Sequence, residues 1–146
     1  METINTINQV LENFSNSISL PSLSLNENNS CILQLDGSQN IQIMYDEDKN
    51  TLNFFTEIGQ LPEQDQTRCC DYLLKSNSEW SLTQGTTLSK KKDQNSILLG
   101  YQLPVLQLSI TIFEKILEHF IQQTDTWKSY LQQLCQGVLP QALAEL

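Results

Sequence analysis

The sequence has 146 residues, and its 17 acidic and 8 basic residues give a formal charge of −9. A chain of this length is expected to form a single domain over residues 1–146 that buries about 68–70% of the surface of the unfolded chain. Because nucleic-acid binders are usually basic, the acidic balance argues against direct contact with nucleic acid. No stretch approaches the roughly 20 apolar residues of a membrane helix, so no membrane association is expected.

The N-terminus and the cysteines favour a reduced, cytosolic protein. The opening segment METINTINQVLENF is polar and amphipathic, unlike a signal peptide, in which an apolar run follows a basic stretch. The adjacent cysteines at 69 and 70 suit neither a zinc knuckle nor a simple disulfide, and no CxxC pair occurs. We therefore expect free thiols packed as small apolar side chains, with no metal and no other cofactor.

The first predicted helix covers residues 3–18. Its apolar residues are spaced alternately three and four apart, which places them on one face of a helix: Ile4, Ile7, Leu11, Phe14 and Ile18. Pro21 prevents any helical continuation.

Three strand-like runs follow the helix. In the second run, Ile41, Ile43 and Tyr45 alternate with polar or flexible neighbours, as on a strand with one buried face. The runs are SCILQL at 30–35, IQIMY at 41–45 and TLNFFTEI at 51–58, separated by the turn sequences DGSQ and DEDKN. Short alternating strands joined by Asp, Gly and Asn turns predict an antiparallel meander.

From Pro62 onward the pattern changes to a helical period. A second helix is predicted at 63–76, then strands in TTLS and SILLGYQLP, then a long helix at 108–134 that Gly137 and Pro140 terminate, with a short tail at 136–146. The predicted class is α+β, with the element order α-β-β-β-α-β-β-α.

A partial calcium-loop motif provides an alternative from a different functional class. Asp46, Asp48, Asn50 and Glu57 occupy positions 1, 3, 5 and 12 of an EF-hand loop. However, Thr51 replaces the glycine of position 6, and the flanks are strand-like rather than helical. Turn chemistry accounts for the same residues, so calcium binding remains only an alternative.

Catalytic motifs are not evident. His119 and Cys135 lie 16 residues apart on one predicted helix, about 24 Å along its axis, so they cannot form a dyad if that helix is straight. A cysteine hydrolase using Cys69 or Cys70 with His119 remains a remote alternative. The sequence also has no glycine-rich phosphate loop. We expect a protein that is not an enzyme.

The basic run at Lys90, Lys91 and Lys92 lies between two strand-like segments. Asp93, Gln94, Asn95 and Ser96 follow it, and these are turn residues. The pattern predicts the solvated tip of a hairpin rather than an arm that binds nucleic acid.

The arrangement as a whole resembles the class I type III secretion chaperones, small acidic dimeric proteins that escort bacterial effectors. The likeness extends from residue 3 to about 134, and its order of elements is the main signal. Its local carriers are VLENFSNSISLPSLSLNENNSCILQLD, YLLKSNSEWSLTQGTTLSKKKDQNSILLGYQLP and FEKILEHFIQQTDTWKSYL, with Trp127 where the final helix of the family often has a tryptophan.

This resemblance implies a homodimer in the bacterial cytoplasm that holds an extended N-terminal segment of a secreted protein, the client. The helix predicted at 63–76 and the later strands would form the dimer interface, with candidates Cys69, Cys70, Leu73, Leu74, Trp80, Leu98 and Tyr101. The helix predicted at 3–18 and the first strands would bind the client, with candidates Val10, Leu11, Phe14, Ile32, Leu33, Leu35, Ile43 and Phe55.

The segment LPSLSLNE at 20–27 is similar to a regulatory member of the family. That likeness implies two competing partners, a small secreted regulator and an antiactivator that otherwise sequesters a transcription activator. Export of the regulator would free the chaperone to bind the antiactivator, and transcription of the secretion genes would rise. A plain effector chaperone without this regulatory role is the alternative.

Overall fold

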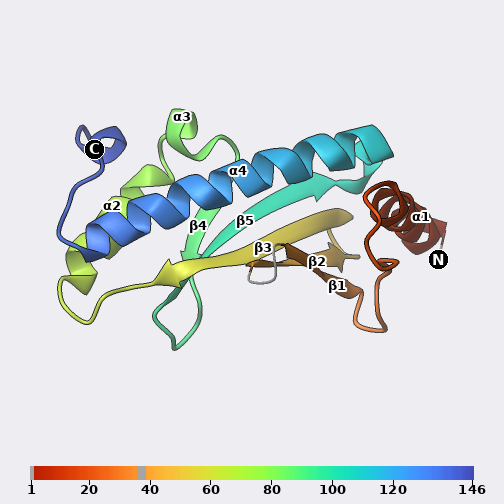
Figure 1. Ribbon diagram of the computed structural model, residues 1–146, viewed down its shortest axis with the longest axis horizontal. Helices are drawn as coiled ribbons and strands as arrows, with labels where there is room; N and C mark the ends of the chain where they lie inside the picture. The colour runs from red at the N-terminus through yellow and green to blue at the C-terminus, as the bar shows by residue number, and fades with distance from the viewer. Residues whose placement is uncertain (1, 36–38) are drawn as a thin grey trace. The chain divides into compact units, whose positions relative to one another are not determined.

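The computed structural model describes residues 2–35 and 39–146, and Figure 1 shows the arrangement of its helices and strands. Five strands form one sheet in the order β1-β2-β3-β5-β4. The main elements are α1 (Glu2–Ser17), β1 (Ser30–Leu35), β2 (Gln39–Asp46), β3 (Thr51–Gln60), α2 (Gln66–Ser76), α3 (Trp80–Thr83), β4 (Thr87–Lys90), β5 (Ser96–Pro104) and α4 (Ile110–Cys135). Short 3-10 turns occur at η1 (Val105–Gln107) and η2 (Gln141–Leu143).

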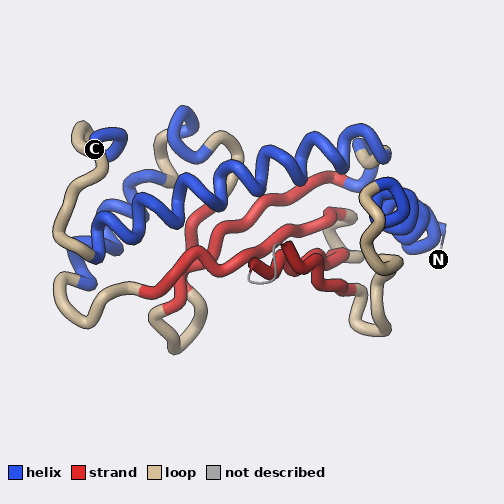
Figure 2. Tube along the Cα trace, viewed as in Figure 1, coloured by secondary structure: helices blue, strands red, loops and turns tan. Residues whose placement is uncertain are grey.

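The predicted α+β class and the order of the main elements are confirmed, as the helices and strands in Figure 2 show. The β1–β2, β2–β3 and β4–β5 pairs are antiparallel. The short helix α3 was not predicted, because four residues are too few to show a helical period. Most of the predicted DGSQ turn, residues 36–38, lies outside the described residues. No helix among the described residues has both the length and the apolar character needed to span a membrane.

The chain divides into two compact units. The first comprises Met1–Phe55 and Gln102–His119, and the second comprises Thr56–Tyr101 and Phe120–Leu146. The elements β3, β5 and α4 each contribute residues to both units.

The core of the first unit forms between α1, the inner face of β1–β3 and the start of α4. Phe113 lies at its centre, with its ring 5.1 Å from that of Phe14 and 5.9 Å from that of Phe54. The predicted stripe on α1 is buried at Ile7, Leu11 and Phe14. Ile18, by contrast, is 47% exposed, because the helix ends at Ser17 and Ser19 adopts a left-handed φ of 58°.

Side chains of α1 hold the extended segment that follows the helix. The Leu25 N–H donates to Asn8 Oδ1 at 2.8 Å, and the Leu23 N–H donates to Ser15 Oγ at 3.2 Å. Asn8 and Ser15 are seven residues apart, about two helical turns, so they lie on the same face of α1. The N–H groups of Leu23 and Leu25, which have no strand partner, thereby obtain hydrogen-bond acceptors.

The core of the second unit forms between α2, β4, β5 and the second half of α4. Trp127 is fully buried, and its indole N–H donates to Gln123 Oε1 at 3.2 Å. The tail that follows α4 packs into this unit through η2, where Leu143 is fully buried. Helix α2 starts at Gln66 rather than at the predicted residue 63, since Asp65 immediately before it adopts a left-handed φ of 61°.

The lysine run lies at a hairpin tip, as predicted. The Lys91 N–H donates to the Ser96 carbonyl at 2.8 Å, and Asp93 adopts the left-handed φ of 58° that the turn needs. Lys91 and Lys92 are exposed.

Candidate protein-binding surfaces

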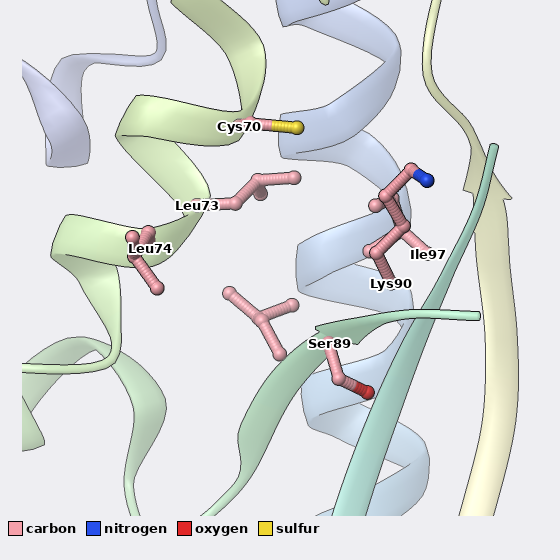
Figure 3. Close-up of a pocket in the computed structure, with 7 residues that line it drawn as sticks. Cys70, Leu73, Leu74, Ser89, Lys90 and Ile97 are labelled. Carbon is pink, nitrogen blue, oxygen red and sulfur yellow. The ribbon is translucent and has the colours of Figure 1, made fainter. Parts of the chain in front are cut away.

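An apolar pocket lies between α2 and β4 in the second unit, and Figure 3 shows its lining side chains. We call it the α2–β4 pocket; its cavity volume is about 180 Å³. Leu73, Leu88 and Ile97 are buried and form its floor, whereas Leu74 is 72% exposed. The complete lining is Cys70, Leu73, Leu74, Leu88, Ser89, Lys90 and Ile97.

The edge strand β4 is tied to the end of α2 by a single amide side chain. Asn77 Nδ2 donates to the Leu88 carbonyl at 2.9 Å, and the Leu88 N–H donates to Asn77 Oδ1 at 2.9 Å. The Asn77 amide therefore satisfies both main-chain groups of Leu88, as a neighbouring strand would. Another strand cannot pair with Leu88 while these bonds are present. The sequence did not predict this contact, because no local pattern relates Asn77 to a strand 11 residues later.

The residues predicted for the dimer interface all lie in the second unit. Trp80 begins α3 and is 82% exposed, so its indole is largely in water. Three of the predicted residues line the α2–β4 pocket, namely Cys70, Leu73 and Leu74. Leu98 and Tyr101 are half-buried on β5, and Cys69 is fully buried in the core. Leu88, Ser89, Lys90 and Ile97 also line the pocket and were not predicted.

The residues predicted to bind the client separate into a buried group and an accessible group. On α1 and the inner face of the sheet, five are buried, namely Val10, Leu11, Phe14, Leu33 and Ile43. Ile32 is 61% exposed, and Leu35 and Phe55 are half-buried.

Strand register places two of the accessible residues in one row. Ile32 pairs with Gln42, which pairs with Phe55 across the next strand, so all three share the outer face of the sheet. In the strand order, β1 lies at one edge of the sheet. The first unit therefore presents apolar side chains beside an edge strand.

The calcium-loop interpretation does not fit this structure. Asp46 ends β2 and Thr51 begins β3, so residues 47–50 form a tight hairpin rather than a loop between helices. The Asp46 carboxylate accepts the Lys49 N–H at 3.2 Å, a common turn bond, and Glu57 lies within β3. Over residues 2–35 and 39–146, no three His, Cys, Asp or Glu side chains converge as metal ligands.

The thiols with perturbed acidity are unlike catalytic nucleophiles. Burial raises the pKa of Cys31 to about 11. Partial desolvation of its sulfur raises the pKa of Cys135, although the residue as a whole is exposed. The pKa of Cys69 is raised mainly by burial and further by the neighbouring Cys135. A nucleophilic cysteine needs a lowered pKa. In addition, His119 and Cys135 lie 16 residues apart on one helix, α4, as predicted.

The chain matches the family model of the Tir chaperone protein (CesT) family over residues 9–128. Its fold is similar to a chain of the ExsC–ExsE complex, with a TM-score of 0.77 and 21% identity over 88% of this chain and 95% of that one. A chain of the HopA1–SchA chaperone–effector complex is similar with a TM-score of 0.73 and 16% identity, over 88% of this chain and 98% of that one.

A third similar structure is that of the Yersinia pestis type III secretion chaperone SycH in complex with a fragment of YscM2. Its TM-score is 0.63 and its identity 24%, over 83% of this chain and 98% of that one. These structures share the fold, and no curated protein sequence matches the chain. The family model covers most of the chain and the fold is that of secretion chaperones, which confirms the resemblance inferred from the sequence: the chain belongs to the Tir chaperone protein (CesT) family.

Proposed function

We propose that the protein is a type III secretion chaperone that holds an extended N-terminal segment of a secreted protein in the bacterial cytoplasm. The family match over residues 9–128 carries this proposal. Binding energy alone suffices for such a role, because covering the apolar side chains of a client prevents their aggregation. Ordering the client costs several kcal/mol, so the contact surface must be large.

The client would bind the outer face of β1–β3 and the free edge of β1. Ile32 and Phe55 present apolar side chains there, and the edge main chain can pair with an added strand whatever the client sequence. The edge at β4 is less suitable, since Asn77 occupies the main chain of Leu88. The buried residues Leu11, Phe14 and Ile43 would support this surface from beneath.

We also propose that the protein is a homodimer that pairs through the α2–β4 pocket and Trp80. This face combines a pocket of apolar floor with the exposed side chains of Leu74 and Trp80. Burying exposed apolar surface of this kind between two copies would stabilise the dimer.

We further propose that the protein has a regulatory role. The protein would be an anti-antiactivator with two competing partners, an ExsE-like secreted regulator and an ExsD-like antiactivator. The similarity of its fold to a chain of the ExsC–ExsE complex, at 21% identity, supports the first of these partners. Competition would follow from mass action at overlapping sites: export of the regulator frees the chaperone, which then sequesters the antiactivator and releases a transcription activator.

Capture from the cytoplasm of the native host tests the proposal. Tagged protein should co-purify with a secreted protein, identified by mass spectrometry, and the variant Ile32→Asp should capture at least about tenfold less of it, since a buried charge opposes binding. Gln132→Asp, at an exposed position of α4 in the second unit, is the matched control. Equal capture by Ile32→Asp and the control would contradict the assigned surface. The absence of any secreted protein or antiactivator would contradict the chaperone function.

A further inference from the structure

The α2–β4 pocket has the size and character of a site for an aromatic side chain. A cavity of about 150 Å³ lined by aliphatic groups binds benzene, and this one is about 180 Å³. In Figure 3, the side chains of Cys70 and Leu73 extend from α2 toward the strands, opposite Lys90 and Ile97. An apolar pocket at an interface is typically filled by one large side chain that contributes much of the binding energy.

Trp80 has the complementary property. It lies four residues beyond the end of α2, in the same unit as the pocket, and 82% of its surface is exposed. Trp80 therefore does not fill the α2–β4 pocket of its own chain. A second copy of the chain supplies both a tryptophan and a pocket, so a twofold axis would pair each Trp80 with the pocket of the other copy.

The charges around the two features are also complementary. Glu79 immediately precedes Trp80, and Lys90 is an exposed residue lining the pocket. Within the described part of the chain, neither side chain makes an ion pair with another residue. A tryptophan entering the pocket of a second copy brings its neighbouring carboxylate toward a lysine.

The Asn77 bonds favour this type of docking over edge-to-edge pairing of strands. Because both main-chain groups of Leu88 are already bonded, β4 cannot extend a continuous sheet into a second copy through that residue. Leu88 can therefore contribute to association at this face only through its side chain.

We propose that Trp80 of each copy fills the α2–β4 pocket of the other, with Glu79 beside the partner subunit's Lys90. The inference rests on the proposed homodimer and assigns its principal contact. The indole of Trp80 enters the pocket and packs against Leu73, Leu88 and Ile97 of the other copy. The Glu79–Lys90 pair sets the orientation of the two copies.

The first test measures dimer dissociation by light scattering and sedimentation over a range of concentrations. Trp80→Ala should raise the dimer Kd at least about a hundredfold, because two symmetric contacts are lost together. Leu106→Ala is the matched control, since Leu106 is 92% exposed in the first unit and should leave the Kd unchanged. Trp80 is exposed in the single chain, so its replacement should leave the melting of the monomer unaltered.

A second readout uses Cys70, which lines the pocket. In the dimer the partner's Trp80 would cover this thiol, so iodoacetamide should alkylate Cys70 slowly in the wild type and about tenfold faster in Trp80→Ala. Fragmentation of the labelled peptides in tandem mass spectrometry distinguishes Cys70 from the adjacent Cys69. Cys135 is exposed and serves as the internal reference, with the same rate in both proteins.

Charge reversal tests the orientation. Glu79→Lys and Lys90→Glu should each raise the dimer Kd several-fold. The double variant should have a Kd close to that of the wild type, because the charge pair is restored with its signs exchanged. If Trp80→Ala remains as dimeric as the control, or if its Cys70 stays protected, the pocket contact is wrong although a homodimer survives. A wild-type protein that is monomeric at all concentrations overturns both the contact and the homodimer, while client capture is measured independently.

Discussion

Gly59 occupies a position where both the backbone conformation and the packing oppose a side chain. Its φ of +148° is rarely adopted by residues with a side chain, and a Cβ there would lie 2.9 Å from Leu131 Cδ2. Gly59→Ala should lower the free energy of unfolding by about 1–3 kcal/mol, since Leu131 must shift within a packed core. Urea denaturation measures this.

The double variant Gly59→Ala with Leu131→Ala separates the two causes. Leu131→Ala alone leaves a cavity and should cost about 2–5 kcal/mol. If the contact with Leu131 dominates, the double variant loses less than the sum of the single losses, because the new methyl group enters vacated space. Strict additivity would mean that backbone strain alone makes Gly59 necessary.

Asn77 contributes through two bonds to one strand residue. Asn77→Ala leaves the Leu88 N–H and carbonyl without their partner and should lower the free energy of unfolding by about 1–3 kcal/mol. For a chain of this size that corresponds to a melting temperature lower by roughly 2–10 °C, measured by circular dichroism. Asn5→Ala, at an exposed position of α1, is the control and should melt with the wild type.

The thiol of Cys31 gives the unfolding free energy a specific dependence on pH. Because burial raises its pKa to about 11, the unfolded chain loses this proton at a lower pH than the folded chain. The contribution of Cys31 to stability is thus complete near neutral pH and is lost as the pH rises from about 9 to 11. The free energy of unfolding of Cys31→Ser, measured by urea titration at each pH, should fall less steeply over that interval than that of the wild type. Equal dependence on pH in the two proteins would contradict the assignment.

At the scale of elements, periodicity predicted the elements that pack on a regular face. The 3–4 spacing of α1 and the alternation of β2 and β3 reflect burial of one face. Most residues expected on that face are buried, but Ile4 is only half-buried and Ile18 is exposed. Element ends were less accurate, because they depend on single residues. The final helix begins at Ile110 rather than at 108, since the Ser109 hydroxyl caps its first turn by accepting the Ile112 N–H at 3.1 Å.

The pocket could be predicted only in part, for a related reason. The α2 residues Leu73 and Leu74 were identified from the helical pattern and the family resemblance, whereas Leu88 and Ile97 were not. Their place in the lining depends on how β4 packs against α2, which is a long-range contact. Likewise, no sequence pattern distinguishes the exposed Ile32 from the buried Leu33 until strand register assigns them to opposite faces.

The segment after α1 provides a prediction for a whole element. Its main chain is held by Asn8 and Ser15, so the double variant Asn8→Ala with Ser15→Ala should release it while α1 remains packed through its apolar stripe. Hydrogen–deuterium exchange at the Leu23 and Leu25 amides should accelerate at least about tenfold, with little change on α4. Unchanged protection at both amides would show that Leu23 and Leu25 are held by their side chains instead.

At the scale of the whole molecule, an acidic chain of charge −9 carries three consecutive lysines, and the structure gives them different surroundings. Lys91 and Lys92 are exposed in the hairpin tip, whereas Lys90 ends β4 and lines the α2–β4 pocket. Lys91→Ser with Lys92→Ser should leave both dimerisation and client capture unchanged, while Lys90→Glu should weaken the dimer alone. Light scattering and capture from the host distinguish these outcomes. If Lys91 and Lys92 prove necessary for either interaction, a surface other than the α2–β4 pocket and the outer face of β1–β3 must take part. The two surfaces proposed here would then be insufficient to explain how the protein influences transcription.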